Sequence, residues 1–176
     1  MAQTAYEAGT YIRYGGTGVC LIERIEEMTF PGGMPARLCY VLKPLRNRNM
    51  EISIPLDSEM ASTRIQPIRT KEEIEKMLSD ALEQDTLPWI EDRKQRNSEF
   101  RKILALGDAQ SLLRMIRCIM KQRTVLRGNG RRLTAADDSA RKEAVQMLEE
   151  EFGFSLGMSA KEASEYICNR LQVAAE

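Results

Sequence analysis

The sequence predicts an α+β protein in which a small β-sheet region is followed by a helical region. Over roughly the first seventy residues, short apolar or alternating runs are separated by turn-forming residues, which is typical of strands joined by turns. Thr70 and Glu73 then form a T-x-x-E capping box, after which apolar residues recur with a helical period. At 176 residues the chain is long enough for two small domains, and we expect them at residues 1–70 and 71–176.

Five short strands are expected in the first region, at residues 10–14, 18–22, 38–42, 50–55 and 63–68. Gly15 and Gly16 lie between the first two strands, where a Gly-Gly pair indicates a tight hairpin. Five short strands cannot build a large sandwich, so the sequence favours a strongly bent sheet or a five-stranded SH3/Tudor-like barrel. Pro55 cannot donate to a ladder and is expected at an edge, which is either merely blunted or open to a strand from another protein.

The second region is expected to form a compact bundle of about five α-helices. Helix boundaries are marked by the stop residue Gly107 and by four N-capping residues, Thr70, Asp108, Thr134 and Ser159. The second helix is expected to run from the surroundings of Trp89 to Gly107, and residues 124–133 are expected to form a basic loop.

Trp89 is the only tryptophan of the chain and precedes a run of charged residues. On one helix, Trp89, Arg93 and Arg96 would share a side because of their i, i+4, i+7 spacing. An apolar plate beside guanidinium groups suits contact with a nucleic-acid backbone and an unstacked base step. Taken alone, the stretch is equally compatible with a core tryptophan on a solvated helix. Residues 91–99 contain no apolar side chain, which favours a surface position.

The charge of the chain is unevenly distributed, although its net value is zero. Residues 91–132 carry twelve basic and four acidic side chains, whereas residues 133–176 carry four and nine. A local positive field matters more to a polyanion than the total charge does. For one basic group a solvated helix face is favoured over a DNA-binding track (Arg114, Arg117 and Lys121), and a second group is equally compatible with solvent or DNA (Arg127, Arg131 and Arg132).

Several classes of chemistry are disfavoured by the composition. The absence of histidine removes histidine bases, histidine-activated nucleophiles and most catalytic zinc sites. The four cysteines are far apart in the sequence, which fits free thiols in a reducing cytoplasm. We expect no signal peptide, because the first residues lack its basic and apolar regions, and no apolar run approaches about 20 residues. We therefore expect a cytoplasmic protein without enzymatic activity, cofactor, metal or membrane contact.

The order of these features resembles the CarD/CdnL family of bacterial transcription regulators. The resemblance extends over residues 6–171 and rests on order and spacing, since no single piece is specific. Its pieces are Gly9, Tyr14-Gly15-Gly16-Thr17-Gly18-Val19, Tyr40-Val41-Leu42, Met50-Glu51-Ile52-Ser53-Ile54-Pro55, Arg64, Trp89, Arg93 to Asn97, Gly107-Asp108 and Leu133-Thr134.

The resemblance implies that a Tudor-like first domain binds the β subunit of RNA polymerase and that the helical domain contacts promoter DNA. In that family the tryptophan acts as a minor-groove wedge near the upstream edge of the melted region, which modulates the stability of the open complex. By position, the resemblance implies polymerase contacts at Met28, Val41, Ile52, Ser53, Ile54 and Pro55. It implies DNA contacts at Trp89, Arg93, Lys94 and Arg96, which would be largely independent of base sequence.

Other functions compete with this hypothesis. The main alternative is a protein-interaction adaptor that binds polymerase and another protein without touching DNA, with Trp89 as an aromatic anchor. An RNA-binding module built on the first domain is disfavoured, because residues 1–90 carry ten basic and thirteen acidic side chains. An enzyme is the least favoured, since no catalytic constellation can be assembled. We expect the protein to act as a monomer.

Overall fold

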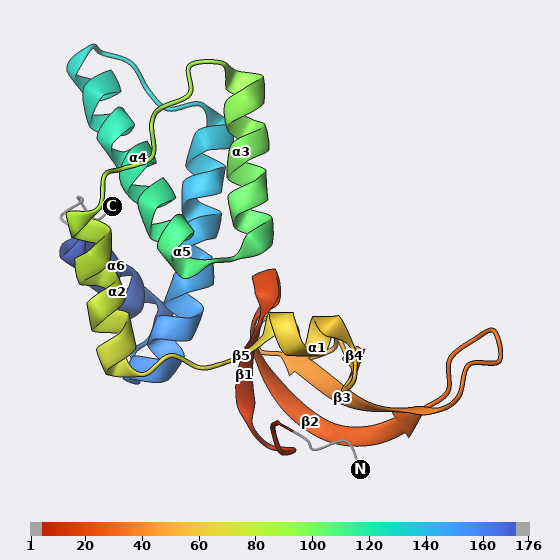
Figure 1. Cartoon of the computed structure of the whole chain (residues 1–176). Helices are drawn as coiled ribbons and strands as arrows, with labels where there is room; N and C mark the ends of the chain where they lie inside the picture. The colour runs from red at the N-terminus through yellow and green to blue at the C-terminus, as the bar shows by residue number, and fades with distance from the viewer. Residues whose placement is uncertain (1–4, 172–176) are drawn as a thin grey trace. The chain divides into compact units, whose positions relative to one another are not determined.

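A computed structural model describes residues 5–171 and shows an α+β protein (Figure 1). The chain divides into two compact units, Met1–Ile68 and Arg69–Glu176, which we call the sheet unit and the helical unit. This division falls where the capping box of Thr70 begins the first long helix. The change from strand to helical periodicity in the sequence therefore coincides with the change of unit.

The sheet unit contains one antiparallel five-stranded sheet with the strand order β4-β3-β2-β1-β5. Its strands are β1 (Tyr11–Tyr14), β2 (Gly18–Met28), β3 (Arg37–Pro44), β4 (Ile52–Pro55) and β5 (Ile65–Pro67). All five expected strands are present, but β2 and β3 are longer than predicted. The sheet is open, because β4 and β5 end the strand order and are not paired with each other. The closed barrel is therefore not observed.

The long strand β2 curves across the unit (Figure 1). Its register against β3 shifts between Ile22 and Arg24, which is a β-bulge at Glu23. Such a bulge bends a strand and increases its twist. The core on one side of the bent sheet consists of Ile12, Tyr14, Cys20, Ile22, Tyr40, Leu42, Ile54, Ala61 and Ile65.

Two short elements of the sheet unit were not predicted. The 3-10 helix η1 (Gly15–Thr17) replaces a two-residue turn between β1 and β2, and Gly15 adopts a φ of 45°. Helix α1 (Glu59–Arg64) precedes β5, and its N-cap Ser58 accepts a hydrogen bond from the backbone N–H of Ala61. Serine is a favoured N-cap, so this cap was a recognisable signal, but the helix is too short to show periodicity.

The helical unit consists of α2 (Lys71–Glu83), α3 (Arg93–Leu106), α4 (Ala109–Gly128), α5 (Ala135–Leu156) and α6 (Ala160–Arg170). The predicted caps Thr70, Asp108, Thr134 and Ser159 are confirmed, the first and last as complete capping boxes. Two predicted boundaries are wrong. Helix α3 begins only at Arg93, and α4 continues through Gly128, so half of the expected basic loop is helical.

The core of the helical unit is centred on α4, which contributes eight buried residues. All of these except Cys118 pack with the buried side chains of the neighbouring helices, namely Ile74, Leu78, Ala81, Phe100, Ala144, Val145, Leu148, Phe152, Ile167 and Leu171. Burying large aliphatic and aromatic side chains contributes about 1.5–3 kcal/mol each. No helix within residues 5–171 is both long and apolar enough to cross a membrane.

Candidate nucleic-acid interface

Trp89 lies in the segment between α2 and α3, not on α3 as the sequence suggested. Its side chain is half-buried and packs against the core of the helical unit. The ring centroid lies 6.4 Å from that of Phe100, with the rings inclined by 59°. Trp89 is therefore neither fully in the core nor fully on the surface, because part of the ring is packed and part remains accessible.

Arg96 holds this tryptophan in place. Its guanidinium carbon lies 4.3 Å from the Trp89 ring centroid, which is a cation–π contact. Arg96 also donates from Nη1 to the carbonyl oxygens of Ile90 (2.6 Å) and Glu91 (3.2 Å). One side chain thus fixes both the indole ring and the backbone that follows it.

The same guanidinium forms a buried, bidentate ion pair with Asp137 of α5. Arg96 donates from Nε to Oδ1 at 2.8 Å and from Nη2 to Oδ2 at 2.9 Å, and the two residues are 3% and 1% exposed. The expected phosphate contact of Arg96 therefore requires correction. Its donors are used inside the helical unit, because an acid 41 residues later in the sequence neutralises it.

Asp137 joins this cluster to the start of α5. Its Oδ2 accepts a hydrogen bond from the Thr134 hydroxyl at 2.7 Å, and the Thr134 Oγ1 in turn accepts one from the backbone N–H of Asp137. Burial by itself raises the pKa of Asp137, but the hydrogen bonds from Arg96 and Thr134 outweigh it. The pKa of this carboxyl therefore lies below its ordinary value, and the group is a carboxylate at neutral pH.

The exposed side of α3 presents the remaining predicted DNA contacts. Arg93 and Lys94 are exposed. Lys94 lines a pocket of about 600 Å³ together with Arg101 and Lys102. Lys102 pairs with Glu99 at 2.7 Å. Arg93, Lys94 and Arg101 have no acidic partner among residues 5–171. Three cations on this helix are thus available to an outside anion.

The two acids that follow Trp89 in the sequence have different roles. Asp92 is the N-cap of α3, and its Oδ1 accepts a hydrogen bond from the backbone N–H of Gln95 at 2.7 Å. A carboxylate at this position also interacts favourably with the helix dipole. Asp92 is therefore explained by the start of α3, whereas Glu91 is exposed and contributes its carbonyl to Arg96.

Two arginines of α4 bind the end of α2 instead of forming a solvated face. Arg117 donates from Nη1 to the carbonyl oxygens of Ala81 and Gln84, the latter at 3.0 Å. Arg114 donates from Nε to the carbonyl oxygen of Asp85 at 3.3 Å. These carbonyls lie at or just after the last turn of α2, where they lack partners within the helix. Arg114 and Arg117 are therefore structural, which corrects the expectation of a solvated face for these two residues, whereas Lys121 is exposed as expected.

Most of the predicted polymerase-binding residues lie on the edge strand β4 or next to it on β3, whereas Met28 is the last residue of β2. Ser53 is exposed, and Ile52, Pro55 and Met28 are half-buried. The two other members are buried: Ile54 belongs to the core of the sheet unit, and Val41 is fully buried on β3. Because β3 is paired on both sides, neither the side chain nor the backbone of Val41 is open to a partner in this structure. Val41 instead pairs with Ser53 and so helps to hold β4 in the sheet.

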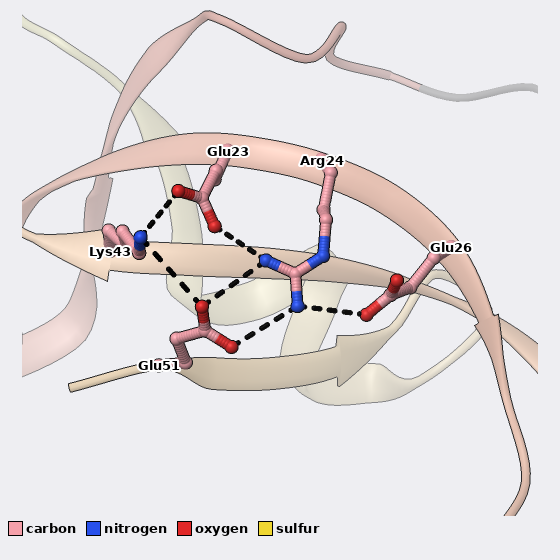
Figure 2. A network of polar contacts seen from close by, with 5 residues as sticks. All are labelled: Glu23, Arg24, Glu26, Lys43 and Glu51. Atoms are coloured by element: carbon pink, nitrogen blue, oxygen red, sulfur yellow. Dashed lines mark hydrogen bonds and ion pairs between the residues drawn. The ribbon is translucent and has the colours of Figure 1, made fainter. Parts of the chain in front are cut away.

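A charged cluster that the sequence did not reveal joins β2 and β3 to Glu51, the residue directly before β4 (Figure 2). Arg24 pairs with Glu26 at 3.0 Å and with Glu51 at 3.2 Å, and it also contacts Glu23. Lys43 pairs with Glu23 at 2.5 Å. The hydrogen bond from Arg24 lowers the pKa of Glu51, and the same contacts raise the pKa of Arg24. Only the strand register brings these five residues together, so no sequence signal could have identified them.

Comparison of the sequence with protein-family models and with curated proteins gives no match. The resemblance to a family therefore remains a hypothesis that rests on the order of the motifs.

Proposed function

We propose that this protein is a transcription regulator that binds the β subunit of RNA polymerase and contacts promoter DNA. In this proposal the helical unit touches DNA near the upstream edge of the melted region and alters the stability of the open complex. The observation that carries the proposal is Trp89, a half-buried ring held by Arg96 next to a helix with exposed, unpaired cations. A fixed apolar plate beside cations suits a wedge at an unstacked base step.

The proposed DNA contact is largely independent of base sequence. Arg93, Lys94 and Arg101 offer charge to phosphates, while Trp89 offers a surface for stacking. Sequence is read by side chains that reach base edges in a groove, and no such set is needed here. The protein would therefore act on the opening of promoters and not on their selection.

The proposed polymerase contact uses the sheet unit, which we regard as an SH3/Tudor-like module. Its strand order and the short helix α1 between β4 and β5 support this assignment. Strand β4 has a neighbour on one side only, and Ser53 is exposed on it. A free strand edge can accept a strand from another protein. We expect Ile52, Ser53 and Pro55 to make the contact, and Val41 and Ile54 to support it.

The decisive experiment compares Trp89→Ala with Leu106→Ala. Leu106 is 73% exposed on the same unit, so its variant controls for loss of an exposed apolar side chain. We expect Trp89→Ala to bind polymerase normally but to lose the effect on the lifetime of the open complex, whereas Leu106→Ala keeps it. An unchanged lifetime with Trp89→Ala would contradict the wedge.

The adaptor alternative is favoured by the partial burial of Trp89, since half-buried aromatic residues also anchor protein interfaces. Binding of forked duplex DNA, measured against salt concentration, separates the two functions. A steep loss of affinity with salt supports phosphate contacts. Absence of binding at low salt, both for the protein alone and with polymerase, would favour the adaptor.

A further inference from the structure

A pocket of about 740 Å³ at the turn between α4 and α5 is lined by four arginines: Arg123, Arg127, Arg131 and Arg132. Thr134 and Asp138, at the start of α5, also line this pocket. None of the lining residues is aromatic. The pocket is separate from the α3 surface described above, whose lining residues it does not share.

The backbone at the end of α4 brings these arginines together. The carbonyl oxygen of Leu126 accepts hydrogen bonds from the N–H groups of Asn129 (3.0 Å) and Arg131 (2.7 Å). The N–H of Gly130 donates to the carbonyl oxygen of Arg127 at 3.0 Å, and Gly130 adopts a φ of 66° that glycine tolerates best. The chain therefore folds back directly after the helix, and Arg131 returns to the turn that carries Arg127.

Within residues 5–171, no acidic side chain neutralises the charge of Arg127, Arg131 and Arg132 in this pocket. No acidic residue occurs between positions 109 and 136 of the sequence. The one acid in the lining, Asp138, is already paired with Arg141 and Lys142, each at 2.9 Å. The side chains of Arg127, Arg131 and Arg132 are exposed and have no partner in the part of the chain that the structure describes.

We propose that this pocket binds the phosphate groups of a DNA backbone, as a second contact beside the Trp89 surface. The proposal rests on the proposed function. Guanidinium groups bind phosphate oxygens through paired hydrogen bonds, and an open pocket without an aromatic residue offers nothing for a base to stack on. The first turn of α5 links the two sites, because Asp137 holds Arg96 and the adjacent Asp138 lines the pocket.

The test measures how the affinity of the full chain for forked duplex DNA depends on salt. The variant Arg127→Gln/Arg131→Gln/Arg132→Gln removes three charges from the pocket. The control Lys71→Gln/Lys76→Gln/Lys161→Gln removes three charges from exposed positions on α2 and α6. Each phosphate contact contributes about −0.9 to the slope of log affinity against log salt. We expect the pocket variant to flatten the slope by about 2 to 3, and the control to leave it nearly unchanged.

A second measurement uses inorganic tripolyphosphate, which shares the phosphate chemistry but is not DNA. We expect the pocket variant to bind it about tenfold or more weakly than the wild-type chain or the control. Equal tripolyphosphate affinities and equal salt slopes in the two variants would overturn the inference. That result would leave the proposed function standing, if Trp89→Ala still loses its effect on the open complex.

The two measurements also distinguish DNA from a phosphorylated small molecule. If the pocket variant loses tripolyphosphate binding but keeps the full salt slope on DNA, the pocket binds free phosphorylated molecules and its DNA role is overturned. If the wild-type chain binds tripolyphosphate but no DNA under any condition, the proposed function fails with the DNA role, and only a phosphate site remains.

Discussion

Basic side chains in the two units are used differently. On the sheet unit, Arg24 and Lys43 lie among Glu23, Glu26 and Glu51, and each cation has at least one acid within 3.2 Å (Figure 2). At the turn between α4 and α5, the described residues offer no free acid to the arginines. The first arrangement satisfies its own charges. The second leaves charge available to an outside anion, which is what distinguishes a binding surface from a structural one.

A third arrangement, the Arg96–Asp137 pair, is buried. Exposed ion pairs contribute little to stability because water screens them. A buried pair behaves differently, because removing one partner leaves the other charge without solvent or counterion. Substitutions in the buried pair should therefore destabilise the fold much more than substitutions among the exposed charges.

The largest effect is expected from Arg96→Met, which leaves Asp137 buried without its partner. We expect the free energy of unfolding in denaturant to fall by about 3–5 kcal/mol. The emission of Trp89, the only tryptophan, should also shift to longer wavelength as the ring loses its cover. Unchanged stability together with unchanged emission would show that the pair does not hold this region together.

The contribution of the Arg96–Asp137 pair to the free energy of unfolding should depend on pH, with a smaller effect than that of Arg96→Met. The pKa of Asp137 is lowered in the folded state, so its ionised form stabilises the fold. This contribution is fully present above the unfolded-state pKa of about 3.9 and is lost as the pH falls through the lower folded-state pKa. The difference in unfolding free energy between wild type and Asp137→Asn should therefore shrink below about pH 4. A difference that stays constant down to pH 2 would contradict the assignment.

A small effect is expected from Arg24→Gln, because the cluster in Figure 2 is largely exposed. The substitution leaves three carboxylates near one lysine, so their mutual repulsion should lower the thermal midpoint slightly at low salt. Added salt screens this repulsion, and the difference from wild type should then disappear. A large loss that persists in high salt would mean that the cluster supports the sheet by packing.

The smallest effect on stability is expected from the pocket variant Arg127→Gln/Arg131→Gln/Arg132→Gln. These side chains are exposed and make no intramolecular pair in residues 5–171. We expect the unfolding free energy to change by no more than about 0.5 kcal/mol, with any change at low salt toward greater stability. A marked loss of stability would show that the arginines are structural, and it would remove the contrast between the two units.

The local features of this protein can be predicted from residues that are close together in the chain. Strand and helix periods, together with caps such as Thr70, Asp108 and Thr134, depend on residues within one turn of one another. For this reason the five strands, the five long helices and the change of unit near residue 70 could all be predicted. Short or irregular elements such as α1 and the start of α3 could not, since they lack enough residues to show a period.

Which basic side chains are free to bind a partner depends on contacts between distant parts of the chain. Arg93, Arg96, Arg117 and Arg131 look alike in a basic stretch, yet Arg96 is neutralised by Asp137 and Arg117 binds the end of α2. These partners lie 41 and 33 residues away, beyond the reach of any local pattern. A cation can bind an outside anion only if no side chain or carbonyl of the protein already binds it. The sequence therefore locates the basic region, but it does not show which cations in that region are unpaired.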